Sequence, residues 1–288
     1  MLVLLTTLLA APALAQDPDF AQAEFAEAEE LDAPVNTLSA ELGATWSTGN
    51  APMASANGGI DAGRKWGSNK VSVDAGAAFT RAAGDGDGDG VLNEAERTAG
   101  FRSWDWSSRR SFAQARYDRF FGEKNSAYVL AGIESDTLAN YKYRAQEQIG
   151  YSRLLVSAES FELKGEIGLN YVQEKYVAGS ELWTEGAAVD YHFPAARLML
   201  GAAWTVNENV KLTEKVEAFE NLLTVAGPFA ENDLRVYNTA ALSVKLTDMF
   251  SLKLSHRLAF DNVPVVTNDI AAAKLDQTTM LTFVASIF

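Results

Sequence analysis

The chain has 288 residues, a formal net charge of −14 and no cysteine, so disulfides, thiolate metal sites and cysteine nucleophiles are excluded. The length suits one large β domain, and apart from the N-terminus no apolar run approaches the length of a transmembrane helix. Twelve of the fourteen excess negative charges lie in two stretches, residues 16–33 with seven acids and residues 84–96 with five, neither of which holds Lys or Arg. Because the remainder is nearly balanced, the composition does not indicate a nucleic-acid partner.

The first fifteen residues predict a secretory signal peptide. A short apolar run ends in Ala13-Leu14-Ala15, an A-x-A cleavage site directly before Gln16. Residues 16–35 follow as an acidic lead-in, which we expect to lie in the periplasm and to be part helical or without regular structure. The sequence therefore predicts a mature protein that starts at Gln16 and leaves the cytoplasm.

From Asn36 onward, apolar and polar residues alternate. Even-numbered residues from Leu38 to Trp46 are Leu, Ala or Trp, and odd-numbered residues from Ser39 to Ser47 are Ser, Glu, Gly or Thr. Such alternation is typical of a strand with one wet face and one apolar face. The same pattern predicts twelve strands, at residues 36–47, 54–65, 71–80, 110–121, 127–136, 142–155, 161–171, 198–206, 210–218, 236–246, 251–260 and 278–288.

Two boundaries stay open at this stage. The fourth strand ends near Phe121 and can begin at Arg110 or as early as Gly100. Residues 176–196 can form an arm of a long loop or an extension of the eighth strand. Gly- and Asn-containing segments between the other strands predict turns.

The last stretch, Thr278 to Phe288, is β-branched and aromatic and ends without a polar tail. A closed membrane barrel uses such an end, because its last strand pairs with its first and an aromatic residue lies in the interfacial girdle. With the secretory signal and an apolar face on nearly every strand, the sequence predicts an all-β protein, a transmembrane antiparallel up-and-down β-barrel of about twelve strands over residues 36–288. We expect it in the cell outer membrane, porin-like, surrounded by outer-membrane lipid and recognised by the barrel-assembly machinery through its C-terminal strand. Connections from odd to even strands should be extracellular.

Short strand and turn pieces resemble a known family. They are Arg116-Tyr-Asp-Arg-Phe120, Asn125-Ser-Ala-Tyr128, Tyr143-Arg144, Ile149-Gly-Tyr151, Trp46-Ser-Thr-Gly-Asn50 and Phe260-Asp-Asn-Val-Pro264. These pieces are similar to the core of the salt-induced outer-membrane protein family, a bacterial outer-membrane barrel domain of unknown function. The resemblance covers roughly residues 36–288 and implies a Gram-negative outer-membrane barrel of the envelope or osmotic-stress type. It carries no catalytic residues.

The polar faces of the strands predict the residues that line the lumen. The early strands contribute mostly acids and the late strands mostly bases, and the barrel closes by bringing these halves together. The predicted lining residues are Glu41, Asp74, Arg116, Asp118, Arg144, Glu162, Lys164, Glu166, Lys211, Lys215, Lys245, Lys253 and Arg257. Asp61 and Glu134 lie on the same faces. The charges can pair and fill the lumen, or an acidic wall can face a basic wall across a narrow channel; a barrel of about twelve strands permits either a plug or a pore.

An outer-membrane lipid hydrolase or acylase is the rival prediction, and a channel for a specific small solute is another. A Ser/His hydrolase needs a histidine beside a nucleophile, and the chain has only His192 and His256. His256 follows Ser255, but neighbours on a strand point to opposite faces. Asp190 and His192 can share a face without a nucleophile beside them. We therefore expect no enzyme and no catalytic residues.

Residues 84–97 contain a calcium-binding loop pattern, which we expect on the extracellular side. Asp85-Gly-Asp-Gly-Asp-Gly-Val-Leu-Asn-Glu-Ala-Glu96 matches the EF-hand loop position for position. The predicted ligands are Asp85, Asp87, Asp89, the carbonyl of Val91, Asn93 and Glu96, and these oxygen donors suit Ca²⁺. The preceding residues read as a strand instead of the usual entering helix, so the sequence predicts a lone EF-hand-like loop at a strand end. An acidic loop without a ligand is the alternative.

Overall fold

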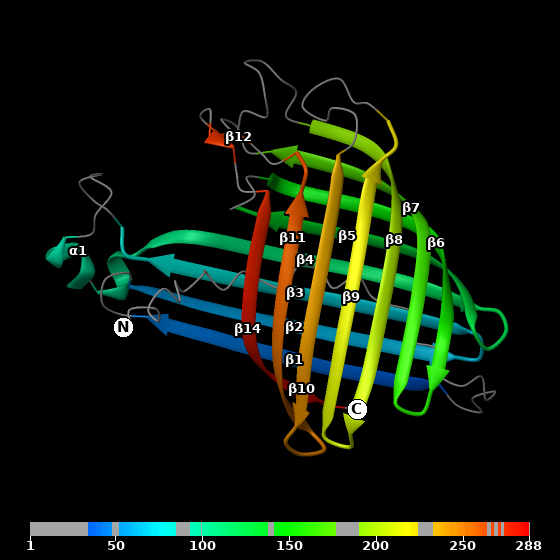
Figure 1. Ribbon diagram of the computed structural model, residues 1–288. Helices are drawn as coiled ribbons and strands as arrows, with labels where there is room; N and C mark the ends of the chain where they lie inside the picture. The colour runs from blue at the N-terminus through cyan, green and yellow to red at the C-terminus, as the bar shows by residue number, and fades with distance from the viewer. Residues whose placement is uncertain are drawn as a thin grey trace, which may run out of the picture.

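The computed structural model describes residues 34–47, 52–84, 93–98, 100–137, 141–176, 190–223, 233–263, 266–267, 270–271 and 274–287. Within these ranges twelve antiparallel strands close into one barrel, in which each strand pairs with its neighbours in the chain (Figure 1). The strands are β1 Val35–Ser47, β2 Met53–Trp66, β3 Asn69–Ala82, β4 Asp105–Phe120, β5 Asn125–Asp136, β6 Tyr141–Ala158, β7 Phe161–Tyr176, β8 Asp190–Asn207, β9 Val210–Asn221, β10 Leu234–Lys245, β11 Phe250–Asp261 and β14 Leu275–Ser286. The prediction of an all-β, twelve-stranded up-and-down barrel is confirmed.

The ring closes between its first and last strands, as the apolar C-terminal stretch predicts. β1 and β14 pair over four residue pairs, from Ser39 with Ser286 to Leu42 with Phe283. By comparison, β11 and β14 pair over eleven, from Phe250 to Phe260. The closing seam is therefore the shortest of the joints that hold β14 in place.

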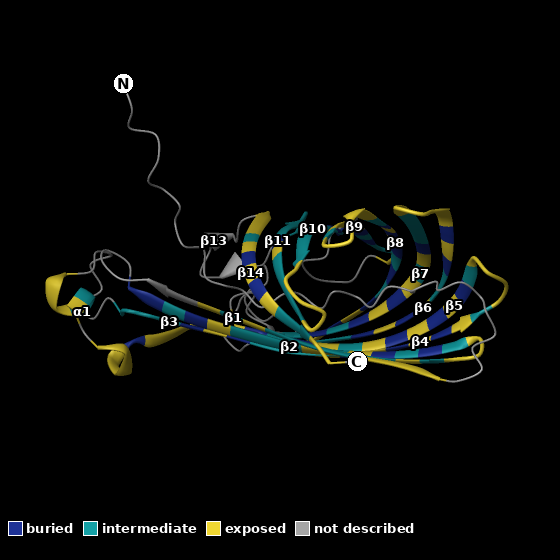
Figure 2. Ribbon diagram, turned by 90° about the horizontal axis from the view of Figure 1, so that it is seen from below, coloured by how far each residue is buried: buried dark blue, intermediate teal, exposed yellow. Residues whose placement is uncertain are grey.

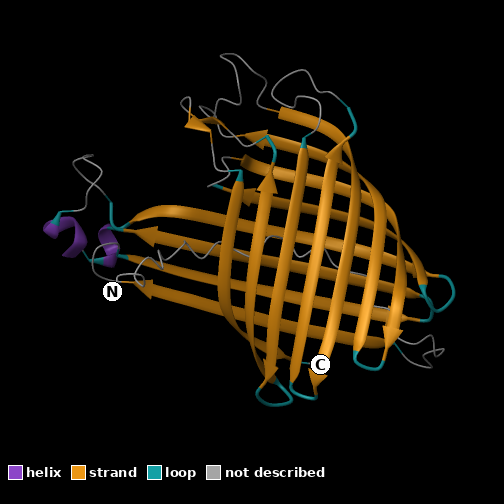
Figure 3. Ribbon diagram, viewed as in Figure 1, coloured by secondary structure: helices purple, strands orange, loops and turns teal. Residues whose placement is uncertain are grey.

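Short and long connections alternate around the ring. Turns at residues 67–68, 121–124, 159–160, 208–209 and 246–249 gather at one end of the barrel (Figure 3). Gly67 and Gly122 have positive φ values of 48° and 71°, a conformation that glycine adopts without steric strain. The start of β1 and the end of β14 lie at this same end, since Val35 pairs with Lys65 and Ser286 N donates to the Met249 carbonyl at 2.8 Å.

The β3–β4 connection carries the helical turns. The α-helix α1 (Glu94–Thr98) and the 3-10 helix η1 (Phe101–Ser103) lie beyond the ring, at the far ends of β3 and β4 (Figures 1 and 2). The last long connection contains a small hairpin of β12 (Val266–Thr267) and β13 (Ile270–Ala271). The sequence did not predict this hairpin, because strands of two residues are too short to show an alternation.

Alternation places polar side chains inside and apolar ones outside. On β5, Ser126, Tyr128 and Glu134 are buried, whereas Val129 and Ile133 are about half exposed on the outer wall. Figure 2 shows the same alternation of burial along the strands. The polar face of each strand therefore builds the interior, and that is where a functional site is to be sought.

The structure resolves two boundaries that the sequence left open. β4 begins at Asp105, between the two starts considered, and residues 190–196 belong to β8. Residues 177–189, the signal peptide at residues 1–15 and the lead-in at residues 16–33 lie outside the described residues. The barrel begins at Val35, one residue before the predicted boundary. In the described part of the chain, no helix combines the length and the hydropathy needed to span a membrane.

Candidate functional site

A notch in the inner wall positions one aromatic ring. Gly150 on β6 and Gly168 on β7 are directly paired. A Cβ atom at Gly150 would lie 2.5 Å from the Tyr128 hydroxyl, and one at Gly168 would lie 2.7 Å from it. Because both positions are glycine, the Tyr128 ring lies against the inner wall across β6 and β7, with its hydroxyl over the glycine pair.

Around this ring lies a set of buried charges that we call the central cluster, composed of Arg116, Asp118, Glu166, Arg197 and Glu217. Arg116 on β4 donates from Nε to Asp118 Oδ2 at 2.9 Å and from Nη2 to Glu166 Oε1 at 2.8 Å. Arg197 on β8 donates from Nη1 to the other Glu166 oxygen at 2.6 Å and from Nη2 to Glu217 on β9. Glu166 on β7 thus joins two guanidinium groups whose side chains are 0% exposed.

Tyr128 completes the central cluster. Its hydroxyl accepts a hydrogen bond from Arg197 Nη1 at 2.7 Å, and the Arg116 guanidinium lies 3.9 Å from its ring centroid. Lys215 adds a third cation, with Nζ 3.2 Å from Glu217 Oε2. The cations of Arg116, Arg197 and Lys215 therefore balance the carboxylates of Asp118, Glu166 and Glu217. Buried charges are tolerated when they are paired in this way.

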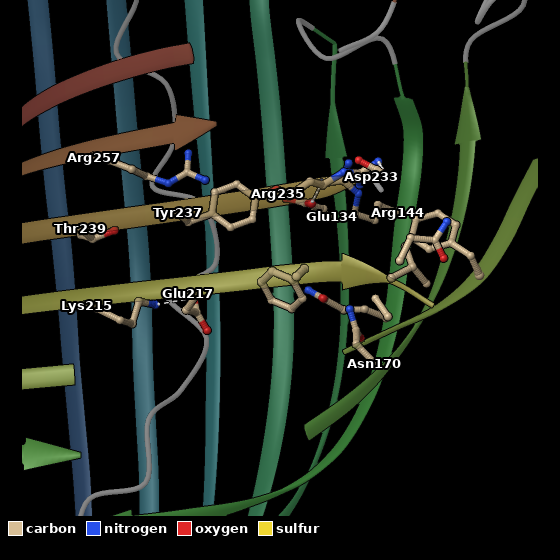
Figure 4. A pocket seen from close by; sticks show the side chains of 16 residues that line it. Glu134, Arg144, Asn170, Lys215, Glu217, Asp233, Arg235, Tyr237, Thr239 and Arg257 are labelled. Carbon is tan, nitrogen blue, oxygen red and sulfur yellow. Dashed lines mark hydrogen bonds and ion pairs between the residues drawn. The ribbon is translucent and has the colours of Figure 1, made fainter. Parts of the chain in front are cut away.

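A second set of charges lies toward the long connections. This rim cluster consists of Glu134, Arg144, Glu174, Asp233 and Arg235. Arg144 donates to Glu174 at 2.6 Å and to Glu134 at 3.1 Å. Arg235 donates to the same Glu174 oxygen at 2.6 Å and lies 3.1 Å from Asp233. Figure 4 shows Asp233, Arg235, Glu134 and Arg144 gathered at one end of a pocket.

The pocket beside the rim cluster is narrow, with a volume of about 50 Å³, which holds a few water molecules. Phe193, Phe219 and Tyr237 contribute apolar walls. Among the described residues, Asn170 Oδ1, Asn221 Nδ2 and Asp233 Oδ1 line it without a hydrogen-bond partner. Two acceptors and a donor in a cavity of this size are satisfied by ordered water, so the arrangement indicates a hydrated vestibule.

The structure brings several of the predicted lumen residues together in these two clusters. Arg116, Asp118 and Glu166 lie in the central cluster with Lys215 beside them, and Arg144 lies in the rim cluster. Most pairs join strands in the middle of the chain instead of joining early acids to late bases.

Other predicted lumen residues lie apart from the clusters. Glu41 and Lys253 form one early-to-late pair at 3.7 Å across the seam. Asp74 accepts a hydrogen bond from Gln114 at 2.9 Å, and Lys164 lies 3.5 Å from Glu162 on the same strand. The Arg257 guanidinium lies 4.9 Å from the centroid of the Tyr237 ring.

Two predicted lumen residues lie elsewhere. Lys211 is exposed at the short-turn end of β9. Lys245 is exposed at the end of β10, where its Nζ lies 2.7 Å from Asp248 in the following turn. That hydrogen bond and the lysine charge hold the pKa of Asp248 below its usual value. Both placements follow from strand length, because alternation alone does not show where the enclosed part of a strand ends.

Sequence reasoning missed six residues of these clusters, namely Tyr128, Glu174, Arg197, Glu217, Asp233 and Arg235. The signal for some of them was present. Arg197 precedes the apolar Leu198 and so belongs to the opposite face of β8, and Glu217 shares the alternation of Lys215. Nothing in the sequence shows that Tyr128 reaches across two strands, because that depends on the paired glycines.

The predicted calcium loop is described only at its end. Asn93 N donates to Glu96 Oε2 at 2.8 Å and Glu96 N donates to Asn93 Oδ1 at 3.1 Å, a reciprocal capping box at the start of α1. Asp85, Asp87, Asp89 and Val91 lie outside the described residues. Within the described ranges no group of three or more His, Cys, Asp or Glu could hold a metal ion. Of the predicted calcium ligands only Asn93 and Glu96 are described, and each accepts a hydrogen bond from the other's backbone N–H; the calcium site stays a prediction.

The two histidines lie on the outer wall. Ser255 is buried and His256, its neighbour, points outward, so the pair cannot act together. His256 Nδ1 instead lies 2.8 Å from Thr279 Oγ1. The exposed His192 ring stacks on Tyr171 with centroids 6.4 Å apart, and Asp190 bonds to Lys175.

A closed barrel with an ion-paired interior defines the class of this protein. Residues 40–286 match a family described as a protein of unknown function, DUF481. The chain belongs to that family. No curated protein matches this chain.

Solved structures show likeness at low sequence identity. The chain is similar to the NanC porin, with 7% identity, a TM-score of 0.47 and coverage of 88% of this chain and 99% of that one. It is also similar to the translocator domain of the autotransporter NalP from Neisseria meningitidis, with 12% identity, a TM-score of 0.44 and coverage of 88% of each chain. The outer membrane channel DcaP of Acinetobacter baumannii is similar with 10% identity and a TM-score of 0.36, over 88% of this chain and 97% of that one.

Proposed function

We propose that this protein is an outer-membrane barrel of the bacterial envelope whose lumen is closed at its centre by the central cluster. Its role is structural, and it passes at most water and small ions. The observation that carries this proposal is Glu166, which joins two fully buried arginines from β4 and β8. The hydrated vestibule beside the rim cluster stops at this cluster.

The energetics favour a closed centre. A solute that passes must separate charges that are already paired and shielded from water, and breaking a buried pair costs roughly 3–5 kcal/mol. The vestibule, at about 50 Å³, holds a few waters and is too small for a sugar or a nucleotide. The alternatives of an outer-membrane enzyme or a channel for a specific small solute have no comparable group of residues among those described.

Conductance in planar lipid bilayers tests the proposal. Wild-type protein should give steps that are absent or roughly tenfold smaller than those of the double variant Glu166→Ala/Arg197→Ala, since truncation opens an aqueous path. Lys175→Ala is the matched control, because it removes an ion pair that lies exposed on the rim. Large steps from the wild-type protein, unchanged by the double variant, would refute a closed centre.

The proposed location has its own test. The outward apolar wall and the alternation of short and long connections support a barrel in the outer membrane, with the short turns facing the periplasm. Density fractionation should place the mature chain, starting at Gln16, in the outer membrane, with heat-modifiable mobility on gels. Recovery as a soluble periplasmic protein would rule this location out.

A role under salt stress, suggested by the family resemblance, predicts slower growth of a deletion strain at high salt.

We further propose that residues 85–96 bind Ca²⁺ outside the ring. Asp85, Asp87, Asp89, the Val91 carbonyl, Asn93 and Glu96 would hold the ion, and the capping box at Asn93 and Glu96 supports the proposal by fixing two of these six in one turn. Bound calcium would neutralise the crowded carboxylates and order the connection that leads to β4.

Calorimetry separates this calcium site from general acidity. The double variant Asp85→Ala/Glu96→Gln should lose calcium uptake, whereas Glu94→Gln, which removes an acid of the same turn that is not a predicted ligand, should retain it. Equal uptake by the wild type and the double variant would end the idea.

A further inference from the structure

Four polar side chains form a patch on the outer wall of the barrel. This outer patch consists of Glu214 on β9, Asn238 on β10, His256 on β11 and Thr279 on β14. Asn238 Nδ2 donates to Glu214 Oε1, and His256 Nδ1 lies 2.8 Å from Thr279 Oγ1. Each of the four points away from the lumen. The sequence neighbours of Glu214, His256 and Thr279, which are Lys215, Ser255 and Met280, are buried on the inward face, and Ala241 is buried on the face of β10 opposite to that of Asn238.

The outer patch lies within an apolar surface. Its neighbours along the outward faces include Leu212 and Val216 on β9 and Leu254 and Leu258 on β11. In a membrane, hydrocarbon tails offer no hydrogen-bond partners at this depth. Ionisable side chains that face lipid are rare for that reason, and where they occur they mark a functional contact.

A groove runs through the same surface. It has a volume of about 480 Å³ and is bordered by Trp204, Leu212 and Leu254, with Glu214 and His256 in its floor. Register explains the groove: Ala240 is paired directly with Glu214 on one side and with His256 on the other. The small Ala240 side chain between two longer polar ones leaves the hollow.

Catalysis does not fit the outer patch. Thr279 beside His256 could supply a hydroxyl and a base, but acyl transfer also needs hydrogen-bond donors aimed at the developing oxyanion. Backbone N–H groups here belong to the β-ladders on both sides, and the Asn238 amide already donates to Glu214. The outer patch therefore has the composition of a contact surface.

We propose that the outer patch is the interface with a second copy of this chain. Glu214 and His256 lie on opposite sides of Ala240, so a two-fold axis near Ala240 places the acid of each copy on the side where its partner carries the base. Small residues at the centre, Ala240 and Ala202, allow the two walls to approach closely, as at other interfaces within membranes. Trp204, Leu212 and Leu254 supply the apolar contact around this polar centre. The inference does not depend on whether the lumen is open or closed.

The absence of cysteine from the chain makes the test direct. Ala240→Cys, which lies near the proposed axis, should form a disulfide-linked dimer of the mature chain in membranes treated with a mild oxidant. Ile149→Cys is the matched control, because Ile149 is 61% exposed on the outer wall of β6, away from the outer patch; it should stay monomeric. Heat-modifiable mobility of both variants checks that the barrel has formed.

Charge substitutions in the Ala240→Cys background identify what holds the copies together. Glu214→Leu and His256→Leu should each lower the linked fraction several-fold, and the double variant should lower it little further, because each removes the same contacts. The exchange Glu214→His/His256→Glu should restore the dimer, since a two-fold interface keeps its complementarity when acid and base change places. Equal cross-linking of the Ala240→Cys and Ile149→Cys variants would overturn the proposal, as would cross-linking of Ala240→Cys only to a different protein.

Discussion

Glu166 is the residue whose removal should disturb the interior most. In the wild type, Arg116, Arg197 and Lys215 balance three carboxylates, and Glu166 contacts both arginines. Glu166→Gln leaves three cations with two carboxylates, and the side chains of these charged residues are at most 7% exposed. Because one buried charge is then uncompensated, we expect the free energy of unfolding to fall by roughly 3–5 kcal/mol, toward the lower figure since the amide oxygen still accepts one hydrogen bond.

A second substitution should recover much of that loss. Arg197→Met added to Glu166→Gln leaves two cations, Arg116 and Lys215, with two carboxylates, and Lys215 keeps its contact with Glu217. The double variant should therefore lose about 2 kcal/mol less than the sum of the two single losses, a coupling of the size found for contacting residues.

Unfolding by denaturant in lipid vesicles, followed through the six tryptophans, gives these free energies. Lys175→Ala, at the exposed pair with Asp190, is the control and should change the free energy by less than about 1 kcal/mol. Additive losses, within about 0.5 kcal/mol, would refute the view of the central cluster as one neutral unit.

Three further outcomes are expected. Gly168→Ala should displace the Tyr128 ring, because the new Cβ would lie 2.7 Å from its hydroxyl, and should lower stability by roughly 1–3 kcal/mol in the same unfolding assay. Lys253→Glu should lower stability by less than about 1 kcal/mol, since its pair with Glu41 is partly exposed, and adding Glu41→Lys should restore it. Asn93→Ala removes one half of the capping box and should speed amide exchange in α1, with a local loss of about 1 kcal/mol.

The sequence predicted the strands well because each has one wall facing apolar surroundings and one facing a polar interior, and this difference repeats every second residue. The same regularity placed Arg116, Glu166 and Lys215 on the inner face. It could not predict the partners of those residues. Partners depend on how far each strand is shifted against the next around a closed ring, and on side chains such as Arg197 that reach over a neighbour.

The lengths of the strands explain the remaining differences between the predicted and the observed structure. Lys211 and Lys245 share the inward alternation of their strands, but they lie past the point where the ring encloses its interior. The hairpin of β12 and β13 has too few residues to show a period. Both cases show that alternation reports the face of a strand and not its position along the barrel.

The short seam between β1 and β14 makes the ring mechanically uneven. Four residue pairs hold this joint, against eleven between β11 and β14, so the same pull applied around the circumference separates the strands there first. The N-terminal strand is then the natural place for the wall to part and rejoin. Under strain we expect this joint to separate before the joints between β4 and β9, each of which is held by eleven or more residue pairs.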